Sequence, residues 1–221
     1  MVDLIHGLTA AQVRDNLERV RERIAAAGRD PQDVQILAAV KYLPSDELQA
    51  LADAGITLLG ENRAQQLVAK TEAYPGLFTW DFIGALQSRR VAALIPHVRY
   101  IHSVATDSAL HQLESHGTPD TKILIEVNVA QDPGKAGIEP RQLPEFLERS
   151  PVEVVGLMTM PPLTDRPEDS RAHFAALREL ATRHGLRELS MGTSQDFEAA
   201  VQEGATIIRL GEVLWARDKI I

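Results

Sequence analysis

The run Val34-Gln35-Ile36-Leu37-Ala38-Ala39-Val40-Lys41 is apolar almost throughout and ends in a lysine. A helix-like segment follows, so the pattern predicts a buried strand with Lys41 at its carboxyl end. An amine held there is poorly solvated and loses its proton more readily than in water, which lets it form a Schiff base with an aldehyde. The alternative is a lysine that lies along a barrel rim and keeps its charge in water.

Seven further strand-like segments follow, with helix-like segments between them. The eight expected strands are residues 34–41, 56–62, 80–84, 98–104, 122–129, 152–158, 188–191 and 206–210. The helical segments include residues 45–54, 63–72, 105–114, 141–149, 167–184 and 195–203. This alternation predicts an α/β fold, a parallel sheet closed into a (β/α)8 TIM barrel. A doubly wound open sheet is the alternative, but no Gly-x-Gly-x-x-Gly follows the first strand.

An extra N-terminal helix precedes the first strand. Thr9 and Gln12 have the spacing of a capping box, and Gly28 ends the helical pattern. The apolar stripe of this helix consists of Val13, Leu17, Val20 and Ile24. Because no linker, repeat or low-complexity tract divides the sequence, we expect one barrel domain over residues 1–221.

The composition limits the classes of function. The 221 residues are 44% hydrophobic and carry a formal net charge of −8. No long basic run stands out, so we expect no nucleic-acid partner. The absence of cysteine excludes disulfides and thiolate chemistry. The first residues lack the features of a secretory signal and no segment reaches the roughly 18 apolar residues of a membrane span, so we expect a cytoplasmic protein without membrane contact.

Two neighbouring strand ends predict a phosphate site. Residues 191–197, Met-Gly-Thr-Ser-Gln-Asp-Phe, lead from the seventh strand into a helix, whose first amides can bind an anion. Ser194 adds a hydroxyl donor, and Gly211 and Glu212 follow the eighth strand. Barrels of this kind often bind phosphate between these two loops. The alternative is that Thr193 and Asp196 only cap the helix.

Arg209 lies within the apolar strand 206–210 and needs a buried acceptor for its permanent charge. One candidate acceptor is a carboxylate such as Glu61. The other is a pyridine nitrogen, which an arginine would keep unprotonated, so that the ring becomes a weaker electron sink. Together, a lysine for an aldehyde, a phosphate site and an arginine for a ring nitrogen indicate pyridoxal 5′-phosphate as the ligand.

The stretches around these residues also resemble a known family, the pyridoxal-phosphate homeostasis proteins. These are single-domain barrels similar to the N-terminal domain of alanine racemase. The resemblance includes Gly60-Glu61-Asn62 and Met191-Gly192-Thr193-Ser194, and it runs from about residue 8 to residue 211. The matching stretches are residues 39–41, 59–65, 80–88, 126–129, 135–138, 156–160, 189–196 and 208–211.

The resemblance implies a role for each matched residue. It places Lys41 as the lysine that holds the cofactor as a covalent aldimine. Arg209 is then the contact to the pyridine nitrogen. The remaining contacts that it implies are Ser194 with its neighbour Thr193 and the backbone of Gly211 and Glu212 at the phosphate, and Asn62 and Met160 along the cofactor.

Four positions depart from the family pattern. Asp81 and Ala85 stand where the family usually has histidines, and Thr193 replaces a methionine. Glu212 replaces a small residue, and its carboxylate must point away from a phosphate dianion.

The resemblance implies a non-catalytic protein that binds pyridoxal phosphate, keeps its intracellular level steady and passes it to apo-enzymes. The alternative is a weak racemase-like enzyme. Against it, we expect no second domain to supply an opposite-face acid or base, and strand alternation should point Tyr42 away from Lys41. A phosphate-sugar barrel enzyme would explain the phosphate site but not Lys41 with Arg209. We expect a monomer.

The seven histidines do not pair at metal-ligand spacing. We therefore expect no metal site and place most of them at the surface or rim. The seven are His6, His97, His102, His111, His116, His173 and His184.

Overall fold

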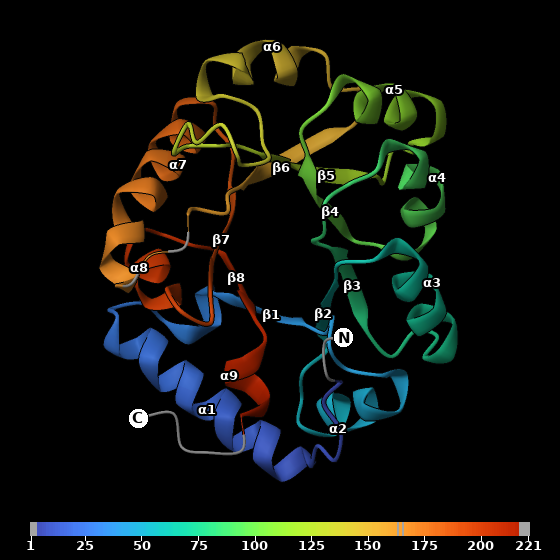
Figure 1. Ribbon diagram of the computed structural model, residues 1–221, viewed down its shortest axis with the longest axis vertical. Coiled ribbons are helices and arrows are strands. Elements are labelled where there is room, and N and C mark those ends of the chain that lie inside the picture. The colour runs from blue at the N-terminus through green and yellow to red at the C-terminus, as the bar shows by residue number, and fades with distance from the viewer. Residues whose placement is uncertain (1–3, 163, 165, 217–221) are drawn as a thin grey trace.

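The computed structural model describes residues 4–162, 164 and 166–216. Residues 1–3, the start of the segment without secretory-signal features, lie outside this range. In the described part, eight parallel strands close into a barrel in sequence order, with helices around it (Figure 1). The strands are β1 (Gln35–Ala39), β2 (Leu58–Glu61), β3 (Thr79–Phe82), β4 (Tyr100–Val104), β5 (Lys122–Glu126), β6 (Glu153–Met158), β7 (Glu188–Thr193) and β8 (Ile207–Leu210). The TIM-barrel prediction is therefore confirmed.

The helices alternate with the strands, as the sequence pattern predicts. They are α1 (Ala10–Ala26), α2 (Leu48–Asp53), α3 (Ala64–Ala73), α4 (Val91–Leu94), α5 (Asp107–His116), α6 (Leu143–Glu148), α7 (Arg171–Arg183), α8 (Phe197–Gln202) and α9 (Glu212–Trp215). Short 3-10 turns cover Pro31–Asp33, Ser45–Glu47, Ser88–Arg90, Ile95–His97, Pro140–Gln142 and Pro167–Ser170. The sequence did not predict α4 or α9, because four residues are too few for helical periodicity.

Closure of the barrel depends on the pairing of its first and last strands. Gln35, Ile36, Leu37 and Ala38 of β1 pair in parallel with residues 207–210 of β8. Leu37 lies opposite Arg209, so these two residues point to the same side of the wall. The loops that follow β1 and β8 are therefore neighbours at the carboxyl end of the barrel.

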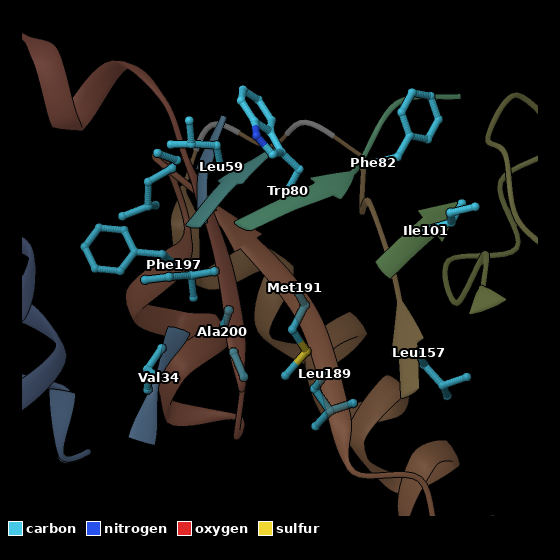
Figure 2. Close-up of a cluster of buried hydrophobic side chains, with 14 of the residues drawn as sticks. Val34, Leu59, Trp80, Phe82, Ile101, Leu157, Leu189, Met191, Phe197 and Ala200 are labelled. Carbon is cyan, nitrogen blue, oxygen red and sulfur yellow. The ribbon is translucent and has the colours of Figure 1, made fainter. Parts of the chain in front are cut away.

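Alternation along each strand sorts side chains between the outer apolar layer and the barrel interior. Trp80 and Phe82 of β3 belong to the outer layer, together with Ile101 of β4 and Met191 of β7 (Figure 2). Burial of this layer against the helices stabilises the fold by roughly 25 cal/mol per Å² of apolar surface. The residue between each outward pair points inward, so polar residues there come together inside the barrel.

The extra helix α1 begins at a capped end and packs outside the barrel beside α9 and α2 (Figure 1). Thr9 Oγ1 accepts from the Gln12 amide at 3.2 Å, as the sequence predicts. The Gln12 carboxamide donates to the carbonyls of Trp215 and Ala216 instead of completing the capping box. This side chain therefore joins α1 to the end of the barrel where α9 lies.

Among the residues that the structure describes, no helix has the length and apolar character needed to cross a membrane.

Candidate functional site

A cavity of about 430 Å³ opens at the carboxyl ends of the strands. Residues from the loops after β1, β2, β6, β7 and β8 line it. All eight residues predicted to contact a cofactor contribute to its wall: Lys41, Asn62, Met160, Thr193, Ser194, Arg209, Gly211 and Glu212. The structure thus brings the eight together, while their individual roles stay predictions.

Lys41 lies in a turn, not at the tip of a strand. The strand β1 ends at Ala39, and Lys41 is exposed at the cavity wall. The prediction of a poorly solvated lysine is therefore wrong for this structure, because the backbone leaves the sheet before Lys41. Its Nζ lies 4.6 Å from the centre of the Tyr42 ring.

Tyr42 lines the same cavity as Lys41. The prediction that it points away is wrong, because the alternation of a strand no longer applies once the chain has turned. A phenol therefore stands beside the amine, which matters for the choice between carrier and enzyme below.

A buried ion pair holds the two loops that carry Lys41 and Asn62. Lys70 Nζ donates to Glu61 Oε2 at 2.6 Å and to the Val40 carbonyl at 2.8 Å. The other oxygen, Glu61 Oε1, accepts from the amides of Asn62 and Arg63. Glu61 is thus the partner of Lys70, and the alternative that it pairs with Arg209 is wrong.

Arg209 points into the barrel from β8 and is 6% exposed. Its Nη1 donates to Ser190 Oγ at 2.6 Å, and its Nη2 donates to the Thr159 carbonyl at 2.9 Å and to Met160 Sδ at 2.8 Å. Burial lowers the pKa of Arg209 to about 10, against the opposite effect of the charges of Asp196 and Glu126. The guanidinium therefore stays positively charged at neutral pH.

The loops after β7 and β8 meet through a hydrogen bond. The Gly211 amide donates to Ser194 Oγ at 3.2 Å. Gly192 permits the turn, because its φ of +90° is left-handed and a Cβ would lie 2.6 Å from that of Ala200. Both the amide and the hydroxyl of Thr193 donate to Asp196 Oδ1, at 2.7 and 2.9 Å. Asp196 therefore braces the loop, while Ser194 faces the cavity.

Asn62 provides a test of whether this cavity suits a polar ligand. Its Oδ1 is buried and has no hydrogen-bond partner within the described residues, although Asn62 lines the cavity. Such an orphan acceptor is costly unless a ligand or water supplies a donor. Together with the Lys41 amine, the Arg209 cation and the Ser194 hydroxyl, this donor and acceptor set fits pyridoxal phosphate.

Sequence reasoning missed a group of buried polar residues in the barrel interior. His102 is fully buried, which makes it the exception to the expectation that most of the histidines lie at the surface or rim. It contacts Asp81 and Ser190. In the sequence, Asp81 stands out only as a departure from the family pattern. The signal that could have found them is a polar residue at the inward position between two apolar outward ones, as in Trp80-Asp81-Phe82.

A separate exposed group lies near the start of the described chain. Ligand atoms of His6, Asp46 and Glu47 lie within 4.8 Å of one another. The Glu47 carboxylate already accepts from the amides of Gly7 and Leu8, at 2.7 and 2.9 Å. This carboxylate therefore anchors the segment that leads into α1.

Known proteins match the whole barrel. The model of the alanine racemase N-terminal domain matches residues 8–217. A pyridoxal phosphate homeostasis protein of Aquifex aeolicus is 38% identical over 217 residues, which are 92% of this chain and 95% of that protein. The chain belongs to the pyridoxal phosphate homeostasis protein family.

Solved structures agree with this membership. PipY of Synechococcus elongatus, a structure with pyridoxal phosphate bound, superimposes with a TM-score of 0.77 at 29% identity, over 92% of this chain and 100% of PipY. Alanine racemase from Corynebacterium glutamicum has a TM-score of 0.72 at 12% identity, over 96% of this chain and 62% of the racemase. The second likeness shows the shared barrel alone.

Proposed function

We propose that this chain binds pyridoxal 5′-phosphate through a covalent aldimine to Lys41 and releases it to apo-enzymes, without efficient catalysis. The observation that carries the proposal is the single cavity that collects Lys41, Ser194 and Arg209 from strands far apart in the sequence. Membership of the homeostasis protein family and the PipY structure with bound pyridoxal phosphate support the choice of ligand.

Each group of residues has a separate task in this proposal. The cofactor supplies an aldehyde that reacts reversibly with an amine. Lys41, exposed at the cavity wall, presents that amine. Ser194 Oγ accepts from the Gly211 amide, so its own hydroxyl proton is available to donate to the phosphate, and Asn62 Oδ1 accepts from a polar group of the ligand. Met160 covers part of the cavity beside Arg209.

Arg209 supports a carrier over an enzyme. Its guanidinium is a donor and remains charged at neutral pH, so it favours a ring nitrogen that carries no proton. An unprotonated ring is a weaker electron sink for reactions at the α-carbon of an amino acid. Reversible binding of an aldehyde needs no such sink. We further propose that the protein acts as a monomer, with apo-enzymes as transient partners.

Borohydride reduction followed by peptide mass mapping tests the attachment. The pyridoxyl label should lie on the peptide that contains Lys41, and the Lys41→Ala variant should lose it. Lys135, which lies in a neighbouring cavity, is the matched control, and Lys135→Ala should keep the label on Lys41. A label found only on another lysine would overturn the assignment.

One observation favours a second candidate function, a weak racemase-like enzyme. Tyr42 stands in the cavity beside Lys41, where a phenol can act as an acid or base. The discriminating assay is exchange of the α-proton of L- and D-alanine in deuterated water. The carrier proposal expects little exchange, and rapid exchange that both Lys41→Ala and Tyr42→Phe abolish would establish the enzyme instead.

A further inference from the structure

Four buried polar side chains on four different strands lie together in the barrel interior. They are Asp81 on β3, His102 on β4, Ser190 on β7 and Arg209 on β8, and all are at most 6% exposed. Burying polar groups is costly unless they are hydrogen-bonded, so their partners must be accounted for. Arg209 lines the cofactor cavity, whereas the other three lie outside its wall.

Hydrogen bonds join these side chains into one continuous series, which we call the hydrogen-bond chain. Arg209 Nη1 lies 2.6 Å from Ser190 Oγ, and Ser190 Oγ lies 2.9 Å from His102 Nδ1. On the other side of the imidazole, His102 Nε2 lies 2.9 Å from Asp81 Oδ2. Arg99, 27% exposed just before β4, closes the chain with bonds of 3.0 and 2.6 Å to the two oxygens of Asp81.

The chemistry of the groups decides which atom donates and which accepts at each step of the hydrogen-bond chain. The Asp81 carboxylate can only accept, so the proton of a neutral His102 lies on Nε2. The bare Nδ1 then accepts from the Ser190 hydroxyl. Because the hydroxyl proton is used in this way, the Ser190 oxygen offers its lone pairs to Arg209 Nη1. If the proton of His102 were on Nδ1, the lone pair of Nε2 would face the Asp81 carboxylate. The Ser190 hydroxyl could then no longer donate to Nδ1.

The surroundings favour the neutral imidazole. Burial lowers the pKa of His102, and the hydrogen bond and charge of Asp81 do not offset it. Burial raises the pKa of Asp81, but its hydrogen bonds to His102 and Arg99 and the positive charge beside it leave that pKa below its usual value. The ring of Tyr100 lies 6.2 Å from that of His102. Other charged groups also act on these residues: Glu126 and Asp196 act on Arg209, and Glu188 acts on Arg99.

We propose that Asp81, His102 and Ser190 are positioning residues that orient the Arg209 guanidinium for the ring nitrogen of the bound cofactor. This inference rests on the proposed function and extends it to residues that do not touch the ligand. Asp81 selects the imidazole tautomer, the imidazole orients the Ser190 hydroxyl, and that hydroxyl fixes one end of the guanidinium. The Thr159 carbonyl fixes the other end.

The first test needs no cofactor, so it stands even if the proposed function fails. Protein labelled with 15N in its histidines is examined by NMR at neutral pH. The His102 ring, identified by its loss in His102→Gln, should carry its proton on Nε2 and have a bare Nδ1. A ring protonated on Nδ1, or on both nitrogens, would overturn the proposal.

The second test measures the effect of the hydrogen-bond chain on the bound cofactor. The visible absorbance of the loaded protein is titrated against pH in Ser190→Ala and in Ser103→Ala. Ser103 is a matched control, because its buried hydroxyl donates to the Gly84 carbonyl and takes no part in the hydrogen-bond chain. In Ser190→Ala, loss of one hydrogen bond to Arg209 should move the midpoint of the absorbance titration by about 0.4–1 pH unit. Equal midpoints in the two variants would show that Ser190 only fills space.

Discussion

Removal of the Lys70 ammonium should destabilise the barrel far more than loss of an ordinary ion pair. The side chains of Lys70 and Glu61 are only 5% and 0% exposed. In Lys70→Met the Glu61 carboxylate keeps the amides of Asn62 and Arg63 on one oxygen but loses its counter-charge on the other. Breaking a buried pair in this way costs about 3–5 kcal/mol.

Urea unfolding, followed by circular dichroism, measures this cost. With an m-value of about 3 kcal/mol/M, the midpoint should fall by roughly 1–2 M. Lys122→Met is the matched control, because the Lys122 pair with Glu153 is 41% and 55% exposed and should contribute at most about 1 kcal/mol. Adding Glu61→Gln to Lys70→Met should recover part of the loss, since no unpaired charge remains. A Lys70→Met midpoint equal to that of Lys122→Met would refute the reasoning.

Three further predictions concern the cofactor and the buried histidine. Ser194→Ala should weaken pyridoxal phosphate binding about 10- to 100-fold and leave pyridoxal binding nearly unchanged, and equal losses in two fluorescence titrations would contradict a phosphate role. Arg209→Glu should change the visible spectrum of the loaded protein and its pH dependence, and an unchanged spectrum in a folded, loaded variant would remove Arg209 from the ring nitrogen. The pKa of His102 is lowered from 6.5 by burial, so its contribution to stability is present above that pH and is lost as the pH falls. The free energy of unfolding should therefore decline less between about pH 6.5 and 5 in His102→Gln, and parallel curves would exclude His102 as the cause.

The sequence predicted the barrel because its apolar runs recur between helical segments, and each run needs only local information. It also placed Ser194 and Arg209 near each other, since parallel strands present their carboxyl ends at one edge. It could not show that β1 ends at Ala39, because Val40 extends the same apolar pattern as far as Lys41. That one difference reverses two predictions, the burial of Lys41 and the direction of Tyr42.

Pairings between distant residues were beyond the reach of the pattern. Glu61 and Lys70 are nine positions apart, yet Lys70 also donates to the carbonyl of Val40, which follows the end of the neighbouring strand β1. His102 meets Ser190 across the barrel, 88 positions away in the chain. Such partners follow from closure of the sheet, so a list of scattered histidines contains no sign of them.

The pairing of β1 with β8 has a consequence for how the protein acquires its ligand. Lys41 follows the first strand, while Arg209 lies on the last, and the wall between them forms when Leu37 comes to lie opposite Arg209. Contacts of such long range pay the entropy of loop closure before they return any stabilisation, and they form late in folding. A chain still emerging from the ribosome therefore has Lys41 but not the pocket. In the proposed function, only the finished barrel can hold the phosphate and the ring while the aldehyde reacts. Ligand binding would then stabilise that closed state by mass action.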